Sequence, residues 1–388
     1  MTKNINYMEP LTKFDVILYL IEPLRIEDLF RQIEGNVFFE KTPERKIKRI
    51  LTELKKENLV QKKEGIISLT DKAANLLAFL LWCKKDSIDY NKPLKKRHEK
   101  VFRKIFENRG GTEFSRQTTA KIIKDLEKAN FLTVIKKKPI LAKSNFTDRT
   151  IFFANIFRYD FGHFESIANI RKIDKDSPKL KEHLIKLHVY STTVTEGNAA
   201  SEKDVERVIN NLPTRLSPRE TLEIMNAKNA IEEVYKTHKT GDISIPLIKR
   251  LHKILMASLV ENPGEFSYVK KRVIGSSTRF PGSKIEIDTA MEAMINFYGK
   301  YRNKMHPLIL APLVHFLFVS IHPFIDGNGR VARLLHSFIL LKADLPVFAF
   351  DPNHRNTYFD LLEKGRSQSA EGFVNFCIEK YAELVEKF

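Results

Sequence analysis

Residues 322–333 constrain the fold of this chain more than any other stretch. They lie between two apolar segments, residues 308–321 and 334–341, which both have the pattern of buried helices. Their sequence, HPFIDGNGRVAR, contains an imidazole, a carboxylate, a Gly-Asn-Gly turn and two arginines. The fold must therefore join two core helices through a tight loop that carries charged side chains.

The loop and the helix after it suit the binding of phosphate groups. Gly327, Asn328 and Gly329 can turn tightly and expose backbone N–H groups, and the next helix directs its positive end towards them. Arg330 and Arg333 fall on one face of that helix, one turn apart, where both can reach a single phosphate chain.

Two further residues of this stretch could take part in a reaction. His322 could act as a neutral general base, although a core histidine is the alternative interpretation, which we prefer for His315. Asp326 is placed to hold Mg²⁺, with phosphate oxygens filling most of the coordination, and it could instead cap the following helix. Phe324 is expected to point into the core.

The stretch resembles the motif of the Fic (Fido) family, H-x-F-x-[D/E]-G-N-G-R-x-x-R, and every defined position is present. The resemblance implies a nucleotidyltransferase that moves AMP from ATP to a Ser, Thr or Tyr hydroxyl of a target protein (AMPylation). Related Doc-type kinases carry lysine where Gly329 stands, which favours AMP transfer over phosphorylation. The implied roles are a catalytic His322, a Mg²⁺ ligand Asp326, and a nucleotide site of Gly327, Asn328, Gly329, Arg330, Arg333, Tyr358 and Phe359.

A second match lies upstream of this motif. Thr192, Glu196 and Gly197 resemble the inhibitory motif [S/T]-x-x-x-E-[G/N] of the same family. The resemblance implies autoinhibition, in which Glu196 forms a salt bridge with Arg333 and displaces the γ-phosphate of ATP. Glu-Gly at the end of a helix is also a common stop signal. Thr195 departs from the family, which usually has an aliphatic residue before the glutamate.

The resemblance implies that residues 178–388 form a Fic domain that includes the inhibitory helix. We expect its fold to be mainly α, an all-helical core interrupted by one β-hairpin at 266–287. This hairpin resembles the flap that aligns a target segment, and its expected contact residues are Ile274, Gly275 and Ser276. Arg366 stands where some relatives have a base-contacting asparagine.

The N-terminal part has a different pattern. Residues 1–88 are predicted to form a winged helix-turn-helix domain, and residues 89–160 a second winged-helix-like module, both α+β. Residues 1–150 contain 33 lysines and arginines against 20 acidic residues, which accounts for +13 of the net charge of +18. Nucleic acid, DNA in particular, is one natural partner for such a surface. The alternatives are that these modules mediate protein contacts or dimerisation, and that the charge reflects a lysine-rich proteome.

The sequence also bears on the cellular location of the protein. No apolar run is long enough to span a membrane, and the first residues lack the apolar centre of a signal peptide. Cys83 and Cys377 lie far apart and have no partner histidines at metal-ligand spacing. We therefore expect a reducing environment without disulfides and a cytoplasmic protein.

The alternative functions are an enzyme that uses Glu196 to remove AMP, and a nucleotide-sensing DNA-binding regulator. The target, its acceptor residue, base specificity, reaction direction, self-AMPylation and homodimer formation are not determined by the sequence.

Overall fold

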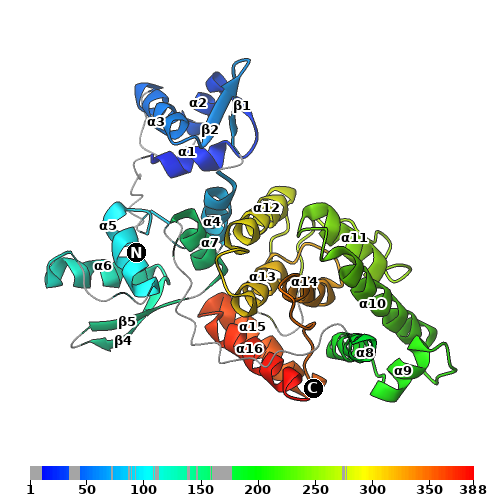
Figure 1. The fold of residues 1–388 in the computed structure, drawn as a ribbon. Helices are drawn as coiled ribbons and strands as arrows, with labels where there is room; N and C mark the ends of the chain where they lie inside the picture. The colour runs from blue at the N-terminus through cyan, green and yellow to red at the C-terminus, as the bar shows by residue number, and fades with distance from the viewer. Residues whose placement is uncertain are drawn as a thin grey trace, which may run out of the picture.

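The architecture comes from a computed structural model, which describes residues 11–388 except 35–43, 71–72, 86–87, 89, 92, 108, 110–112, 138–139, 146, 158, 160–176, 273–275 and 277. The described chain consists mainly of α-helices, with two small antiparallel sheets between residues 24 and 144 (Figure 1). The prediction of a mainly helical protein with an all-helical C-terminal core is confirmed.

The first 88 residues contain short helices and a three-stranded sheet. Their elements are α1 (Lys13–Tyr19), β1 (Leu24–Arg25), α2 (Ile26–Glu34), α3 (Glu44–Lys56), β2 (Val60–Lys63), β3 (Ile66–Leu69) and α4 (Ala74–Lys85). Strand β3 lies between β1 and β2, and the β2–β3 hairpin turns at Gly65, whose positive φ of 82° suits glycine. The assignment of this region as a winged helix stays a prediction.

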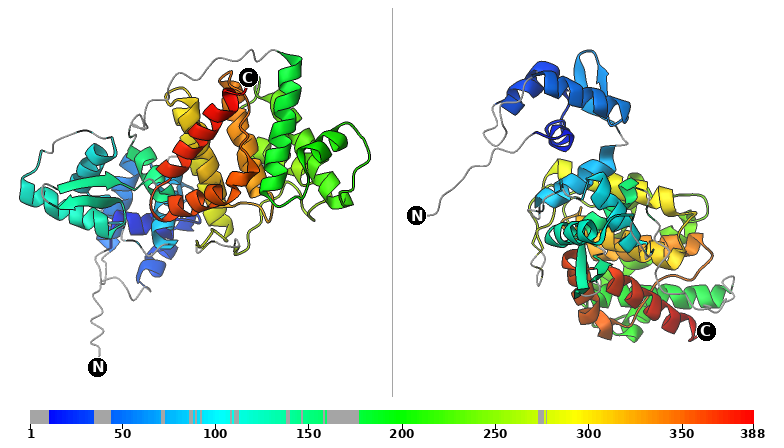
Figure 2. Two further views of the ribbon diagram at one scale, coloured as in Figure 1. Left: turned by 90° about the horizontal axis from the view of Figure 1, so that it is seen from below. Right: turned by 90° about the vertical axis from the view of Figure 1, so that its left-hand side faces the viewer.

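Helix α4 connects this sheet to the rest of the protein. Its residues 76–83 are all apolar and buried, because the helix packs against α7 and against α12 of the C-terminal part. The first module therefore stands apart from the C-terminal helices and joins them through α4 (Figure 1 and the right-hand view of Figure 2).

The second module has two helices, a hairpin and a closing helix. These are α5 (Lys96–Phe106), α6 (Arg116–Lys128), β4 (Leu132–Lys137), β5 (Ile140–Ser144) and α7 (Asp148–Phe157). Ser115 caps α6 by accepting a hydrogen bond from the Thr118 N–H at 3.2 Å. Its core is aromatic, with Phe102, Phe131 and Phe153 in mutual edge-to-face contact.

Residues 178–388 form a helical bundle around one apolar helix. Residues 308–321 of α13 are all buried, and α13 packs against α12, α14 and α16 (Figure 1). The elements are α8 (Pro178–Thr195), α9 (Glu202–Ile209), α10 (Pro218–Thr237), α11 (Ile245–Leu255), α12 (Lys284–Tyr301), α13 (Pro307–Ile321), α14 (Asn328–Lys342), the 3₁₀ turn η2 (Pro352–His354), α15 (Arg355–Ser367) and α16 (Glu371–Val385).

The predicted β-hairpin at 266–287 is wrong for the residues described there, which include no strand, and α12 already begins at Lys284. The backbone donors of this segment have other acceptors. The Ser267 N–H donates to the Pro323 carbonyl at 2.8 Å, and the Gly282 and Ser283 N–H groups donate to the Glu286 carboxylate. Loop and cap hydrogen bonds therefore replace a cross-strand ladder.

Within the described part of the chain, no helix combines the length and the apolar character that crossing a membrane requires.

Candidate functional site

His322 lies at the end of α13 in a left-handed conformation, with φ 55° and ψ 56°. Its N–H still donates to the Phe318 carbonyl at 2.9 Å, so the helix ends there and the chain turns sharply into the glycine loop. Histidine tolerates this conformation better than a β-branched residue would. The turn fixes the imidazole between the two central helices.

The imidazole of His322 is held in one neutral form. Nδ1 lies 3.3 Å from the Val319 carbonyl, which can only accept, so Nδ1 carries the proton and Nε2 keeps its lone pair. Burial lowers the pKa of His322 to about 4, and the charges of Arg366 and Lys271 act in the same direction. Near neutral pH this side chain is therefore a base and not a cation.

Asn328 and His252 fix the shape of the glycine loop. The Asn328 side chain accepts from the Phe324 N–H and donates to the Phe324 carbonyl, both at 2.9 Å. The His252 ring stacks on Phe324 with centroids 3.6 Å apart, accepts the Gly264 N–H, and lies 3.1 Å from the Asp326 carbonyl. Asn328, predicted to bind nucleotide, thus shapes the loop with its side chain and leaves the cradle to backbone groups.

Gly327 is required at its position. It has a φ of +76°, and a Cβ atom there would come within 2.8 Å of Met256 Sδ on the neighbouring chain segment. No L side chain fits both conditions without strain.

Asp326 presents its carboxylate at the mouth of the loop. The side chain is 48% exposed, and Oδ1 accepts the Gly327 N–H at 2.6 Å. The described residues include no cluster of three potential metal ligands. A single carboxylate still fits Mg²⁺, which takes one or two protein oxygens and fills its shell with phosphate oxygens and water.

Arg330 is a buried cation whose hydrogen bonds are incomplete. It is 5% exposed, its Nη2 lies 3.4 Å from Asp326 Oδ1, and its Nη1 lies 3.9 Å from Glu223. Its Nε is buried without a partner among the described residues. A buried donor without an acceptor is costly, so this group is ready to bind an anion.

Arg333, at 1% exposed, is bound on several sides by the helix α8 and by Tyr358. Nε donates to Thr192 Oγ1 at 2.8 Å, Nη2 donates to the Thr192 carbonyl at 3.2 Å, and Nη1 donates to the Tyr358 hydroxyl at 3.2 Å. Nη2 also donates to Glu196 Oε1 at 2.5 Å. The contact between Glu196 and Arg333 that the resemblance implies is present.

The Glu196 carboxylate also approaches the first turn of α14. A Cβ atom on Gly329 would lie 2.4 Å from Glu196 Oε1, so only glycine allows the carboxylate to come this close. The N-terminus of a helix attracts anions, and here it has a side-chain carboxylate beside it. Gly197 follows with a φ of +103° and ends α8.

Tyr358 and Phe359, the two aromatic residues predicted in the nucleotide site, lie in different environments. Tyr358 is fully buried, and its hydroxyl lies 2.8 Å from His315 Nε2 as well as contacting Arg333. Phe359 is 36% exposed, so it is the member of the pair that a base could reach. His315 is a buried core histidine, as expected.

Residues of the predicted flap contact α15. Ser276 Oγ donates to Glu363 Oε2 at 2.6 Å, and Thr278 Oγ1 donates to the same carboxylate. Arg366 also binds Glu363, at 3.2 Å, and lies over the ring of Phe280. Ile274 and Gly275 lie outside the described residues.

Phe280 links this flap region to the site, because its ring lies 4.8 Å from the ring of His322. His252 and Glu363, which support the loop and the flap, were missed by sequence reasoning. His252 lies on α11, far upstream of the motif, and only the packing of α11 against α14 brings it to the loop. No local pattern distinguishes either residue from other helical residues.

The assembled site can bind a chain of phosphates and remove a proton beside it. Backbone N–H groups and Arg330 are available to an anion, the exposed carboxylate of Asp326 is available to a metal ion, and His322 is a neutral base. The ion pair of Glu196 with Arg333 lies across one side of this arrangement.

Comparisons with known proteins agree with this geometry. Residues 242–340 match the family model described as "Fic/DOC family". The chain is 25% identical over 282 residues to a protein adenylyltransferase Fic of Culex quinquefasciatus, covering 70% of this chain and 50% of that protein. It is 30% identical over 208 residues to the protein of the same name of Drosophila yakuba, covering 51% of this chain and 41% of that protein. It therefore spans about half the length of the curated relatives it matches.

A solved structure shares the fold. A Fic-domain-containing signaling protein of Bacteroides thetaiotaomicron superimposes with a TM-score of 0.51 at 18% identity, covering 62% of this chain and 95% of that one. At this identity the likeness concerns the fold alone.

Proposed function

Because residues 242–340 match the family model described as "Fic/DOC family", we propose that this chain is a protein adenylyltransferase whose resting state is inhibited by Glu196. One observation carries the proposal. The Glu196 carboxylate binds Arg333 at 2.5 Å and approaches Gly329 on the helix that begins the phosphate site, beside a neutral His322. The curated relatives are named adenylyltransferases, which supports this function over AMP removal and over nucleotide sensing.

In the proposed reaction, ATP lies with its phosphates along the first turn of α14. The N–H groups of Gly329 and Arg330 and the Arg330 guanidinium bind the α- and β-phosphates, and Arg333 binds the γ-phosphate. Asp326 holds Mg²⁺, which neutralises phosphate charge when bound.

His322 then activates the acceptor. Its Nε2 accepts the proton of the target hydroxyl as that oxygen attacks the α-phosphorus and pyrophosphate leaves. The hydrogen bond of Nδ1 to the Val319 carbonyl keeps the ring oriented and disperses the positive charge that it acquires.

Inhibition follows from competition for one guanidinium. Glu196 and the γ-phosphate are both anions, and Arg333 Nη2 cannot bind both in the observed geometry. ATP that enters while this ion pair persists therefore lacks its γ-phosphate contact, and its α-phosphate is not aligned with the acceptor.

The test compares ATP labelled at the α- or the γ-phosphate, incubated with a cell lysate and either Glu196→Gly or the double variant Glu196→Gly with His322→Ala. Because kinases in the lysate also use ATP, the double variant measures the background. We expect protein-bound label above this background from α-labelled ATP only. Label above background from γ-labelled ATP would indicate phosphate transfer by this chain and contradict the proposal.

We also propose that the basic N-terminal modules bind double-stranded DNA. Helix α3 turns its apolar side chains inward and exposes five basic ones, Arg45, Lys48, Arg49, Lys55 and Lys56. Such a face suits phosphate contacts along a groove.

A mobility shift with the full chain tests this. Replacing Lys48 and Lys55 by alanine should weaken binding and reduce the salt dependence by about one unit of slope per lost phosphate contact. Replacing the exposed Lys304, which lies in the helical bundle, should change neither. Binding that does not depend on salt would contradict the proposal.

We propose that the target is a protein with a hydroxyl side chain. We also propose self-AMPylation, which would appear as label on the chain itself. Finally, we propose that the chain forms a homodimer, which light scattering would detect. We propose a cytoplasmic location, which the two buried free thiols, Cys83 and Cys377, support. Cell fractionation would test it.

A further inference from the structure

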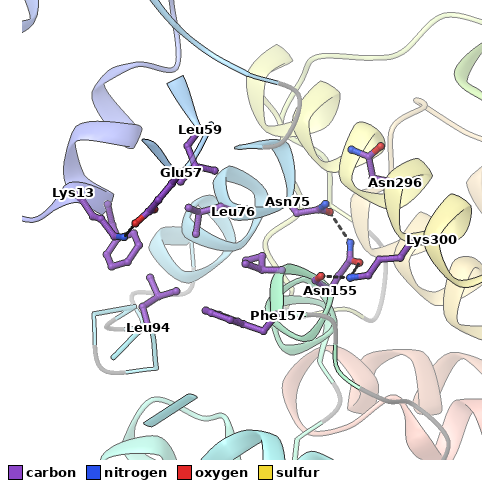
Figure 3. Close-up of a pocket in the computed structure, with 12 residues that line it drawn as sticks. Lys13, Glu57, Leu59, Asn75, Leu76, Leu94, Asn155, Phe157, Asn296 and Lys300 are labelled. Carbon is purple, nitrogen blue, oxygen red and sulfur yellow. Dashed lines mark hydrogen bonds and ion pairs between the residues drawn. The ribbon is translucent and has the colours of Figure 1, made fainter. Parts of the chain in front are cut away.

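A cavity of about 720 Å³, lined by no residue of the catalytic motif, lies where the N-terminal modules meet the helical bundle (Figure 3). Its walls come from α1, the turn before β2, α4, α7 and α12, together with Leu94. A cavity of this volume can hold an organic molecule of drug-like size. The AMP-transfer mechanism uses none of its residues.

One wall of the cavity is polar, and its hydrogen bonds fix the direction of each amide. Lys300, which can only donate, donates to Asn155 Oδ1 at 2.9 Å and also to the Asn155 carbonyl. Asn155 must therefore use its Nδ2 as the donor to Asn75 Oδ1, at 2.8 Å. This leaves the Nδ2 group of Asn75 without a partner among the described residues.

Asn296 adds a second free amide to the same wall. It lies one turn before Lys300 on α12, and its side chain makes no hydrogen bond to a described residue (Figure 3). The wall thus offers the N–H groups of Asn75 and Asn296 beside the ammonium of Lys300. A group rich in acceptors and negatively charged complements such a row of donors.

The remaining lining is apolar or electrically balanced. Phe14, Leu76, Leu94 and Phe157 provide apolar surface. At the α1 end, the Lys13 ammonium is paired with the Glu57 carboxylate at 2.6 Å, so these two charges cancel. Lys300 is thus the cation of the polar wall.

We propose that this cavity is a binding site for an amphipathic carboxylate, with the carboxylate on Asn75, Asn296 and Lys300 and the apolar body against Phe14, Leu76 and Phe157. A bound molecule would contact α1, α4, α7 and α12 together, and so would join the first module to the helical bundle. The inference is independent of the proposed AMP transfer, since binding can be measured without ATP.

The test uses the full chain and a dansyl-labelled undecanoate, whose fluorescence rises in an apolar environment. We expect a saturable signal with one site per chain, displaced by dodecanoate but not by dodecyltrimethylammonium, which has the same tail and the opposite charge. Asn296→Leu preserves the size of the side chain and removes its donors, so the affinity for the probe should fall about tenfold or more.

Lys300→Met should weaken binding at least as strongly. Because Lys300 also bonds to the end of α7, circular dichroism must confirm that this variant folds, whereas Asn296 has no such structural bond. Lys304→Met, four residues along and outside the cavity, serves as the matched control and should bind the probe like the wild type. No saturable binding, equal displacement by the cation, or unchanged affinity in Asn296→Leu would each overturn the proposal.

Discussion

Replacing Glu196 should tighten the binding of ATP, because it releases Arg333. The background is His322→Ala, which prevents turnover so that calorimetry measures binding alone. Glu196→Gln keeps the size of the side chain and removes its charge. The contact is a charge-assisted hydrogen bond of 2.5 Å to a guanidinium that is 1% exposed. Such a bond contributes about 1.5–3 kcal/mol, against about 0.5–1.5 kcal/mol for a neutral one.

The difference of about 1–2 kcal/mol corresponds to a dissociation constant for ATP that is about five- to thirty-fold lower in Glu196→Gln. Glu196→Gly removes the whole contact and should lower it by about ten- to 150-fold. Both variants should also be less stable without ATP. That loss stays below the cost of isolating a buried charge, because Thr192 and Tyr358 still bind the guanidinium. Unchanged ATP affinity in both variants would refute the competition for Arg333.

Three further changes test separate parts of the structure. Thr195→Val should raise the free energy of unfolding by about 1 kcal/mol in urea, because Thr195 Oγ1 is buried without a partner; a loss of stability would contradict this. Burial keeps the pKa of His322 at about 4, so AMP transfer by Glu196→Gly should stay constant as pH falls through 6.5 and decline only near pH 4; a midpoint near 6.5 would show an exposed imidazole. Gly327→Ala should lower the melting temperature, at a cost of about 1–3 kcal/mol, because of its positive φ and the nearby Met256, whereas Gly299→Ala on open helical surface should not.

The stability of the fold should also depend on pH. Burial lowers the pKa values of His188, His252 and His322 to about 4, so these groups take up protons in the unfolded chain before the folded one. The free energy of unfolding should therefore decrease as pH falls from about 6.5 towards 4.

The sequence was sufficient for features that depend on local pattern. The two apolar segments predicted the central helices α13 and α14, and the residues between them predicted a tight loop with a phosphate-binding character. The contact of Glu196 with Arg333 came from the resemblance and not from physical reasoning, because residues so far apart in the chain meet only through the packing of α8 against α14.

Other features depend on tertiary contacts that no local pattern contains. Tyr358 was expected in the nucleotide site, and the contact of its buried hydroxyl with Arg333 could not be read from the local sequence. The segment 266–287 has strand-like composition, but side chains such as Glu286 and the carbonyl of Pro323 accept its backbone donors. The hydrogen bonds of Asn155 likewise join α7 to α4 and to α12, which lie in different parts of the chain.

The rate of AMP incorporation from α-labelled ATP, compared between wild type and Glu196→Gly under identical conditions, tests the central claim most directly. We predict incorporation about ten- to 150-fold faster in the variant, with both activities lost when His322 is replaced by alanine. Equal rates in the two proteins, or labelling that persists without His322, would contradict the account.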